Sequence, residues 1–186
     1  MYPFLCVICF SLVEGFPFIT QWELHNDLVI TLPLTDVGIY DFNVEWGDET
    51  SDVISIYNQN EVSHTYSVAG NYTVNITGTL TGWRFDNAGD RLKLVEISQW
   101  GDVNLGNQNG YFFGCENLTV TATDVLNLTG VTNLRSMFHN AYSLTTVPEI
   151  ELWDLSAVSD LNFMFHDCHN FNSSGLAAWD VKKYSQ

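Results

Sequence analysis

The sequence predicts a mainly β protein, in which a small β-sandwich is followed by a short stack of repeated chain turns. Residues 16–90 contain short runs of alternating apolar and polar residues separated by turn residues, which is typical of sandwich strands. Residues 91–186 contain apolar residues that recur every 26 or 27 positions, a spacing that indicates a repeat stack. Hydrophobic residues make up 46% of the 186 residues, which is enough for a packed core.

Residues 1–15 precede both regions and have the pattern of an export signal. Met1 to Leu12 is apolar and uncharged, and it is too short to span a bilayer. Val13-Glu14-Gly15 then offers small residues where a signal peptidase cleaves. We therefore expect a secreted or cell-surface protein. A buried first strand is the alternative, which the absence of Lys and Arg from this segment keeps open.

The strands expected within residues 16–90 are supported by their alternation. Residues 28–32 form a β-branched run between turn residues. In residues 39–46 the apolar side chains fall on one face and the acidic and amide side chains on the other, as in a half-buried strand. Residues 72–76 alternate in the same way after the turn residue Gly70. Several short strands at this spacing predict a sandwich.

Three short motifs in this region resemble the PKD (polycystic kidney disease) domain. They are Val44 to Asp48 (VEWGD), Ser63 to Tyr66 (SHTY) and Gly70 to Val74 (GNYTV). The resemblance covers about residues 18–82 and implies an immunoglobulin-like β-sandwich that acts as a spacer or binding module. Glu49 departs from the glycine usual in that family. The resemblance to the PKD domain assigns structural roles to six motif residues: Trp46, Gly47, Asp48, His64, Tyr66 and Tyr72.

Asp48 and His64 are an acid and a histidine, residue types that can belong to a catalytic site. Such a pair needs a nucleophile placed by a third group, and no such signature is present in the sequence. Asp side chains commonly bond the backbone of their own turn. We therefore predict structural roles for both residues and no enzymatic activity.

The repeat in residues 91–186 is visible as columns of apolar residues in constant phase. Each chain turn would bury its columns against the next turn, because one turn alone cannot cover them. The predicted repeat core consists of Phe112, Leu118, Leu126, Val131, Phe138, Leu144, Trp153, Val158, Phe165, Phe171 and Trp179.

These units resemble the BspA-like leucine-rich surface proteins. The resemblance lies in Met137-Phe138 and Met164-Phe165, and in the phrases at residues 153–155 (WDL) and 179–181 (WDV). It implies a leucine-rich-repeat solenoid of about three turns over residues 91–186, in an exported protein that binds host or neighbouring molecules. It implies no cofactor.

The net charge of the chain excludes some classes of binding partner. The net charge is −16 with six Lys and Arg, so the basic surface that nucleic acid requires is not expected. No second apolar segment of membrane length occurs, so we do not expect an integral membrane protein. The sequence thus predicts a non-catalytic adhesion or recognition protein for an extracellular protein or glycan. A module that self-associates through open solenoid ends, or an accessory fragment of a larger extracellular enzyme, remains an alternative.

Several residues are candidates for sites of other kinds. His139 and His166 share a repeat position, with Asp167 and His169 nearby, but we expect a polar surface position rather than a metal centre. Trp22 and Trp83 lie outside the motifs and repeat columns, so they are the tryptophans open to an exposed, ligand-binding role. The candidate glycosylation sites are Asn71, Asn75, Asn117, Asn127 and Asn172.

Cysteine positions give a sharper expectation. Cys6 and Cys9 would leave with the signal, whereas Cys115, Ala141 and Cys168 fall in one repeat column. Two chain turns would separate the cysteines by about 9–10 Å at the usual strand spacing, which is beyond disulfide reach. We predict two free, buried thiols.

Overall fold

The computed structural model describes residues 15–179. Residues 1–14 of the predicted signal, with Cys6 and Cys9, and the motif residues Asp180 and Val181 lie outside the described residues. Over the described range the chain is mainly β and contains no α-helix. Three short 3-10 helices are present there: η1 (Asn60–Val62), η2 (Ile150–Leu152) and η3 (Ser174–Ala178).

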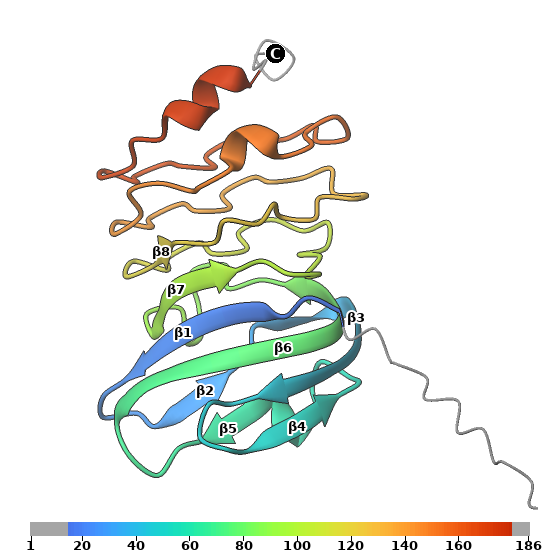
Figure 1. Ribbon diagram of the computed structural model, residues 1–186, viewed down its shortest axis with the longest axis vertical. Coiled ribbons are helices and arrows are strands. Elements are labelled where there is room, and N and C mark those ends of the chain that lie inside the picture. The colour runs from blue at the N-terminus through green and yellow to red at the C-terminus, as the bar shows by residue number, and fades with distance from the viewer. Residues whose placement is uncertain (1–14, 180–186) are drawn as a thin grey trace, which may run out of the picture.

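Six strands form one open sheet, in the order β4-β3-β6-β1-β7-β8, and β2 pairs with β5 in a separate two-stranded sheet (Figure 1). The strands are β1 (Phe18–Leu24), β2 (Val29–Thr31), β3 (Leu34–Glu45), β4 (Ser51–Ile54), β5 (Ser63–Thr65), β6 (Gly70–Trp83), β7 (Leu94–Gln99) and β8 (Thr119–Val120).

The alternation seen in the sequence places the expected side chains in the core. On β3, Tyr40, Phe42 and Val44 are buried while Asp41 and Glu45 are exposed. The neighbouring strand β6 buries Val74 and Ile76 in the same manner. Burial of one face of each strand removes its apolar side chains from water, which is the main favourable contribution to folding.

Strand direction changes along the sheet. β1 pairs antiparallel with β6 on one side and with β7 on the other, whereas β7 pairs parallel with β8. Beyond β7 the chain runs in successive turns that lie one above another, ending with η3 farthest from β4 and β5 (Figure 1). β7 is therefore the strand at which the chain passes from antiparallel pairing to parallel stacking.

Backbone hydrogen bonds join these turns at nearly constant sequence intervals. The N–H of Phe85 donates to Tyr111 O at 3.1 Å, and Phe112 and Phe138 donate to residues 137 and 164, each at 2.8 Å. The rings of Phe112, Phe138 and Phe165 stack along the same direction, with centroids 5.7 and 5.6 Å apart. The 26- and 27-residue spacing of these phenylalanines is thus the spacing at which their rings meet.

The position of the first turn differs from the sequence expectation. In the phenylalanine column, hydrogen bonding between turns begins at Phe85, which the sequence boundary at residue 90 assigned to the sandwich. Phe85 precedes Phe112 by one 27-residue interval, so it occupies the same column. β1 also contributes to both halves through β6 and β7, so the boundary does not separate two independent sheets.

The tryptophans outside the motifs are core residues rather than surface ones. Trp22 and Trp83 are both fully buried, which excludes them as the exposed ligand-binding aromatics that the sequence left open. The Phe18 ring lies 5.3 Å from that of Trp83 and 6.3 Å from that of Trp100. These large rings fill the layer between the sheet and the stacked turns, and one apolar core runs through both.

Candidate functional site

The turn after β3 brings the acid and histidine of the WGD and SHTY motifs together. His64 Nε2 lies 2.8 Å from Asp48 Oδ2, and the imidazole stacks on the Trp46 ring with centroids 4.9 Å apart. Asp48 Oδ1 also accepts hydrogen bonds from the Thr50 backbone N–H and hydroxyl, at 3.2 and 2.5 Å. Partial burial acts to raise the pKa of Asp48, but the hydrogen bonds from Thr50 and His64 outweigh it and lower that pKa.

This arrangement is suited to holding a turn rather than to catalysis. The Thr50 hydroxyl is 3.5 Å from the same nitrogen, Nε2, that meets Asp48. In a nucleophile–base–acid triad the acid and the nucleophile bind opposite nitrogens of the imidazole. The Tyr66 hydroxyl donates to Trp46 O at 2.8 Å and closes the cluster. The structural roles of these motif residues remain a prediction, and these contacts are the geometry on which it rests.

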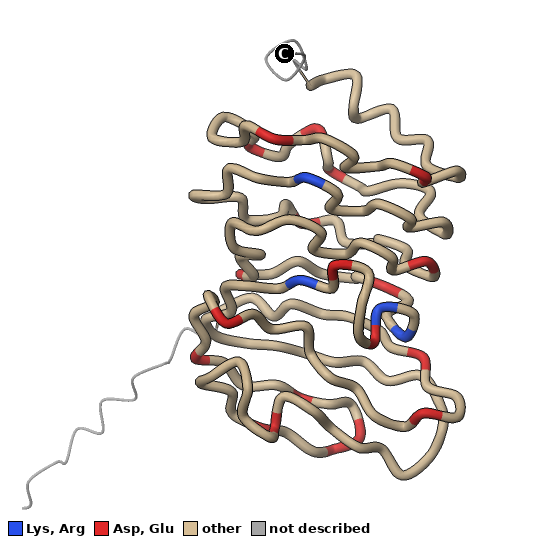
Figure 2. The backbone as a smooth tube through the Cα atoms, turned by 180° about the vertical axis from the view of Figure 1, so that it is seen from behind, with Lys and Arg blue, Asp and Glu red and all other residues tan. Residues whose placement is uncertain are grey.

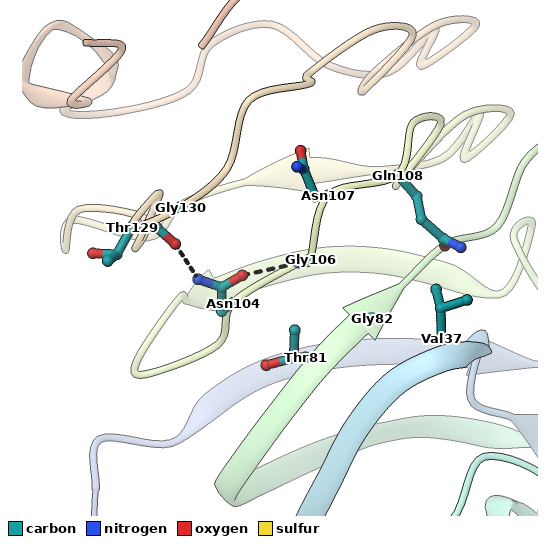
Figure 3. Close-up of a pocket in the computed structure, with 9 residues that line it drawn as sticks. All are labelled: Val37, Thr81, Gly82, Asn104, Gly106, Asn107, Gln108, Thr129 and Gly130. Atoms are coloured by element: carbon teal, nitrogen blue, oxygen red, sulfur yellow. Dashed lines mark hydrogen bonds between the residues drawn. The ribbon is translucent and has the colours of Figure 1, made fainter. Parts of the chain in front are cut away.

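A neutral pocket lies where the end of β6 meets the first stacked turns (Figure 3). It has a volume of about 400 Å³, and amides, hydroxyls and glycines dominate its lining. The lining residues are Val37, Thr81, Gly82, Asn104, Gly106, Asn107, Gln108, Thr129 and Gly130. No sequence pattern indicates this pocket, because its residues come from β3, β6 and two separate turns.

Hydrogen bonds hold most of the amides in the pocket wall. Asn104 Nδ2 donates to Thr129 O at 2.9 Å and Asn104 Oδ1 accepts from Gly106 N at 3.0 Å, as the dashed lines in Figure 3 mark. Asn107 Oδ1 accepts from both the backbone and the hydroxyl of Thr132, at 2.9 Å each. Gln108 differs, because its Oε1 is buried without a hydrogen-bond partner within the described chain. An unpaired buried acceptor costs free energy.

The structure brings two of the three candidate metal ligands together. His139 and His166 are in contact, and Asp167 joins them, whereas the His169 ring stacks on Tyr142 instead. His169 is therefore not part of that group. Partial burial, followed by the nearby His166, lowers the pKa of His139.

Repeat-core burial follows the position of each turn in the stack. The predicted residues from Phe112 to Val158 are all buried, while Phe165, Phe171 and Trp179 are half-buried in the last described turn. Phe165 and Trp179 line an apolar depression of about 370 Å³ with Leu161, Phe163 and Leu176 among its other residues.

The cysteine prediction is confirmed. Cys115 and Cys168 are both free and buried. Burial raises the pKa of the Cys115 thiol well above its ordinary value and raises the pKa of Cys168 to about 11.

The candidate glycosylation sites are unequally accessible. Asn71, Asn117, Asn127 and Asn172 are exposed. Asn75 is half-buried on β6, where its Nδ2 donates to Glu45 at 3.2 Å. On accessibility alone, Asn75 is the poorest of the five acceptors.

Charged residues are dispersed over the described surface (Figure 2). Arg84 pairs with Asp86 at 2.6 Å, Lys93 with Asp27 and Asp90 at 2.7 Å each, and Arg135 lies 3.7 Å from Asp160. Across residues 15–179, no helix has both the length and the apolar character needed to cross a bilayer.

Comparison with known proteins places the stacked half of the chain in a family. Residues 80–186, more than half of the chain, match the family described as Mycoplasma protein of unknown function, DUF285. The chain belongs to the DUF285 family. The DUF285 match begins at residue 80, whose carbonyl accepts a hydrogen bond from the Asn104 N–H of the next turn at 3.1 Å. No curated protein and no solved structure matches the chain.

Proposed function

We propose that this DUF285 protein is a non-catalytic recognition module that acts outside the cell. The neutral pocket of Figure 3 is the observation that carries the proposal. Its lining includes no ionisable side chain and consists mainly of amides, hydroxyls and glycines. A neutral ligand rich in hydroxyl groups, such as a glycan, matches that lining because it offers donors without requiring charge compensation.

The finer architecture belongs to the same proposal. We assign residues 16 to about 83 to a PKD-like β-sandwich and the following residues to a BspA-like leucine-rich-repeat solenoid. Two sheets packed by the WGD and SHTY motifs support the first assignment. Stacked phenylalanines and interturn hydrogen bonds support the second.

Export is a further part of the proposal. The Phe16 N–H donates to Asp102 Oδ2 at 2.8 Å, so the described fold is anchored from the residue after the predicted cleavage position. N-terminal sequencing of the secreted protein should begin near Phe16. Recovery of an intact Met1 on a cytosolic product would contradict the extracellular assignment.

Glycan-array screening followed by calorimetry tests the pocket. We expect Gln108→Ala to weaken binding of any glycan hit at least about tenfold, because it removes a polar side chain from the pocket lining. Asn71→Ala, at an exposed position on β6, is the matched control and should bind normally. Equal binding by Gln108→Ala and the parent chain would show that the pocket is not the binding site.

Self-association is the second candidate function. The half-buried Phe165 and Trp179 leave an apolar surface on the last described turn. Such a surface is suited to contact with another chain turn. Light scattering across a concentration series should then show dimers that Phe165→Ser weakens, whereas a constant monomer mass would dismiss this candidate.

A further inference from the structure

A cluster of three ionisable side chains lies on the stacked turns, outside the pocket of Figure 3. His139 Nε2 is 3.1 Å from His166 Nδ1, and Asp167 Oδ2 is 3.1 Å from that same Nδ1. The three nitrogen and oxygen atoms all lie within 4.8 Å of one another. His139 comes from one turn and the other two residues from the next, so stacking of the turns assembles the group.

The orientation of His166 distinguishes this cluster from a simple ring stack. Phe113 precedes His139 in the same column and stacks parallel to it, with centroids 4.4 Å apart and planes inclined by 7°. His166 follows at 4.7 Å but is turned by 73°. This rotation brings a nitrogen of His166 to a nitrogen of His139, where parallel stacking would have continued ring on ring.

Two of the three ligand-atom separations are close to those between neighbouring ligands of one metal ion, and all three atoms lie within 4.8 Å of one another. Two ligand atoms about 2.0–2.2 Å from a tetrahedral ion are roughly 3.3–3.6 Å apart, and the 3.1 Å separations require only a small adjustment. His166 and Asp167 side chains remain 48% and 45% exposed, so solvent can complete the coordination. Imidazole ligands favour zinc, copper and nickel over calcium or magnesium.

We propose that His139, His166 and Asp167 form a binding site for a divalent transition-metal ion, with zinc as the probe. The ion would replace the N–H···N contact between the two imidazoles and join adjacent turns through both of them. This site is independent of the proposed ligand pocket, since the two share no residue.

The column itself supplies substitutions that the backbone already accommodates. Phe113 occupies the position of His139 and His166 in the preceding turn. Asn140 occupies the position of Asp167, and both have a left-handed backbone, with φ of 60° and 58°. His139→Phe, His166→Phe and Asp167→Asn therefore remove one ligand each while retaining residue types that this stack already contains.

Zinc titration of the full chain by calorimetry tests the site, with Co²⁺ visible absorption as a second measurement. We expect one zinc ion per chain. The zinc affinity of each of the three variants should be at least about tenfold weaker, because removal of a group that holds the metal generally has an effect of this size. His169→Asn and His25→Asn are the controls and should bind as the parent does, since neither residue belongs to the cluster. Absence of binding by the parent chain would overturn the proposal.

Two further outcomes are equally decisive. Unchanged zinc affinity in His166→Phe, with the fold verified by circular dichroism, would place any binding elsewhere on the acidic surface. If that variant fails to fold, Asp167→Asn and the Co²⁺ spectrum of the parent chain carry the test. A parent spectrum with the weak bands of hexa-aqua cobalt would then contradict nitrogen ligation.

Discussion

At the scale of single residues, the stacked turns depend on positions with a left-handed backbone. Asn87, Gly114, Asn140 and Asp167 occupy one column, and each has a positive φ between 58° and 80°. Glycine, asparagine and aspartate adopt this conformation at the lowest cost. The recurrence of these residue types at one interval shows that the backbone bend, and not only the apolar column, is encoded locally.

Glu49 is a residue at which that local preference is violated. It has a φ of 70° in the turn after β3, where the PKD-like pattern has glycine. Glu49→Gly should therefore stabilise the fold by up to about 1 kcal/mol, because the left-handed penalty of roughly 1–2 kcal/mol exceeds the entropy that glycine loses. Urea unfolding measures the change.

The control for Glu49→Gly is the same substitution at Glu61, whose backbone is not left-handed. There glycine should destabilise the protein. A loss of stability in Glu49→Gly similar to that in Glu61→Gly would mean that the turn carries no strain at residue 49.

The hydrogen-bonded Asp48 predicts a pH dependence of stability. Its pKa in the folded protein is lowered below its ordinary value of 3.8, so its stabilising contribution is present above that value and is lost as pH falls through the folded pKa. The advantage of the parent chain over Asp48→Asn should shrink as the pH falls below about 4. Thermal unfolding from pH 7 to pH 3 measures it.

Asp52→Asn is the control variant for Asp48→Asn. Asp52 is a hydrogen-bonded carboxylate in the same region, because it accepts a hydrogen bond from Trp46 Nε1 at 2.8 Å. An advantage over Asp48→Asn that does not vary between pH 7 and pH 3 would refute the assigned role of the ionised Asp48 carboxylate.

At the scale of structural elements, the stacked phenylalanines carry the contact between turns. Phe138 is fully buried between Phe112 and Phe165. Phe138→Ala should cost about 3–5 kcal/mol of unfolding free energy, since the neighbouring turns cannot refill the space that the ring leaves. Chemical denaturation measures this loss.

Phe163 provides the matched comparison, because it lies in the following turn and is 50% exposed. Phe163→Ala should cost far less than Phe138→Ala. A loss below about 1 kcal/mol for Phe138→Ala would mean that the Phe112–Phe138–Phe165 column does not hold the turns together.

Sequence periodicity predicted the facing of the strands and the spacing of the stacked turns. Alternation in β3 and β6 and the spacing of Phe112, Phe138 and Phe165 reflect burial that repeats regularly along the chain. The same periodicity places Cys115 and Cys168 two turns apart as free thiols. The turn at Phe85 was assigned to the sandwich, and the structure shows that the Phe85 ring packs against Trp22 and Trp83, with centroids 6.1 and 5.9 Å apart.

At the scale of the whole molecule, the sheet and the stacked turns share one core. Phe18 contacts Trp83 and Trp100, and Trp100 in turn contacts Phe112, with centroids 6.0 Å apart. β1 is hydrogen-bonded to both β6 and β7. Since neither half can separate without exposing these rings, both halves should lose their structure together.

We therefore expect a single calorimetric unfolding transition. Destabilising either half, with Ile76→Ala on β6 or with Phe138→Ala in the stack, should lower the same transition midpoint, because the transition is cooperative. Two separable transitions, only one of which responds to each substitution, would show that residues near 83–90 join two independently folding domains.

The sequence alone determined the β class, the facing of the strands, the interval of the stack and the free state of the cysteines, because these properties follow from patterns along the chain. Only the tertiary structure decided the shared core around Trp22 and Trp83, the neutral pocket with Gln108, and the rotation that brings a nitrogen of His166 to a nitrogen of His139. Each of these depends on residues brought together from different strands or turns. Distances between such residues are set by packing and register, which periodicity does not specify.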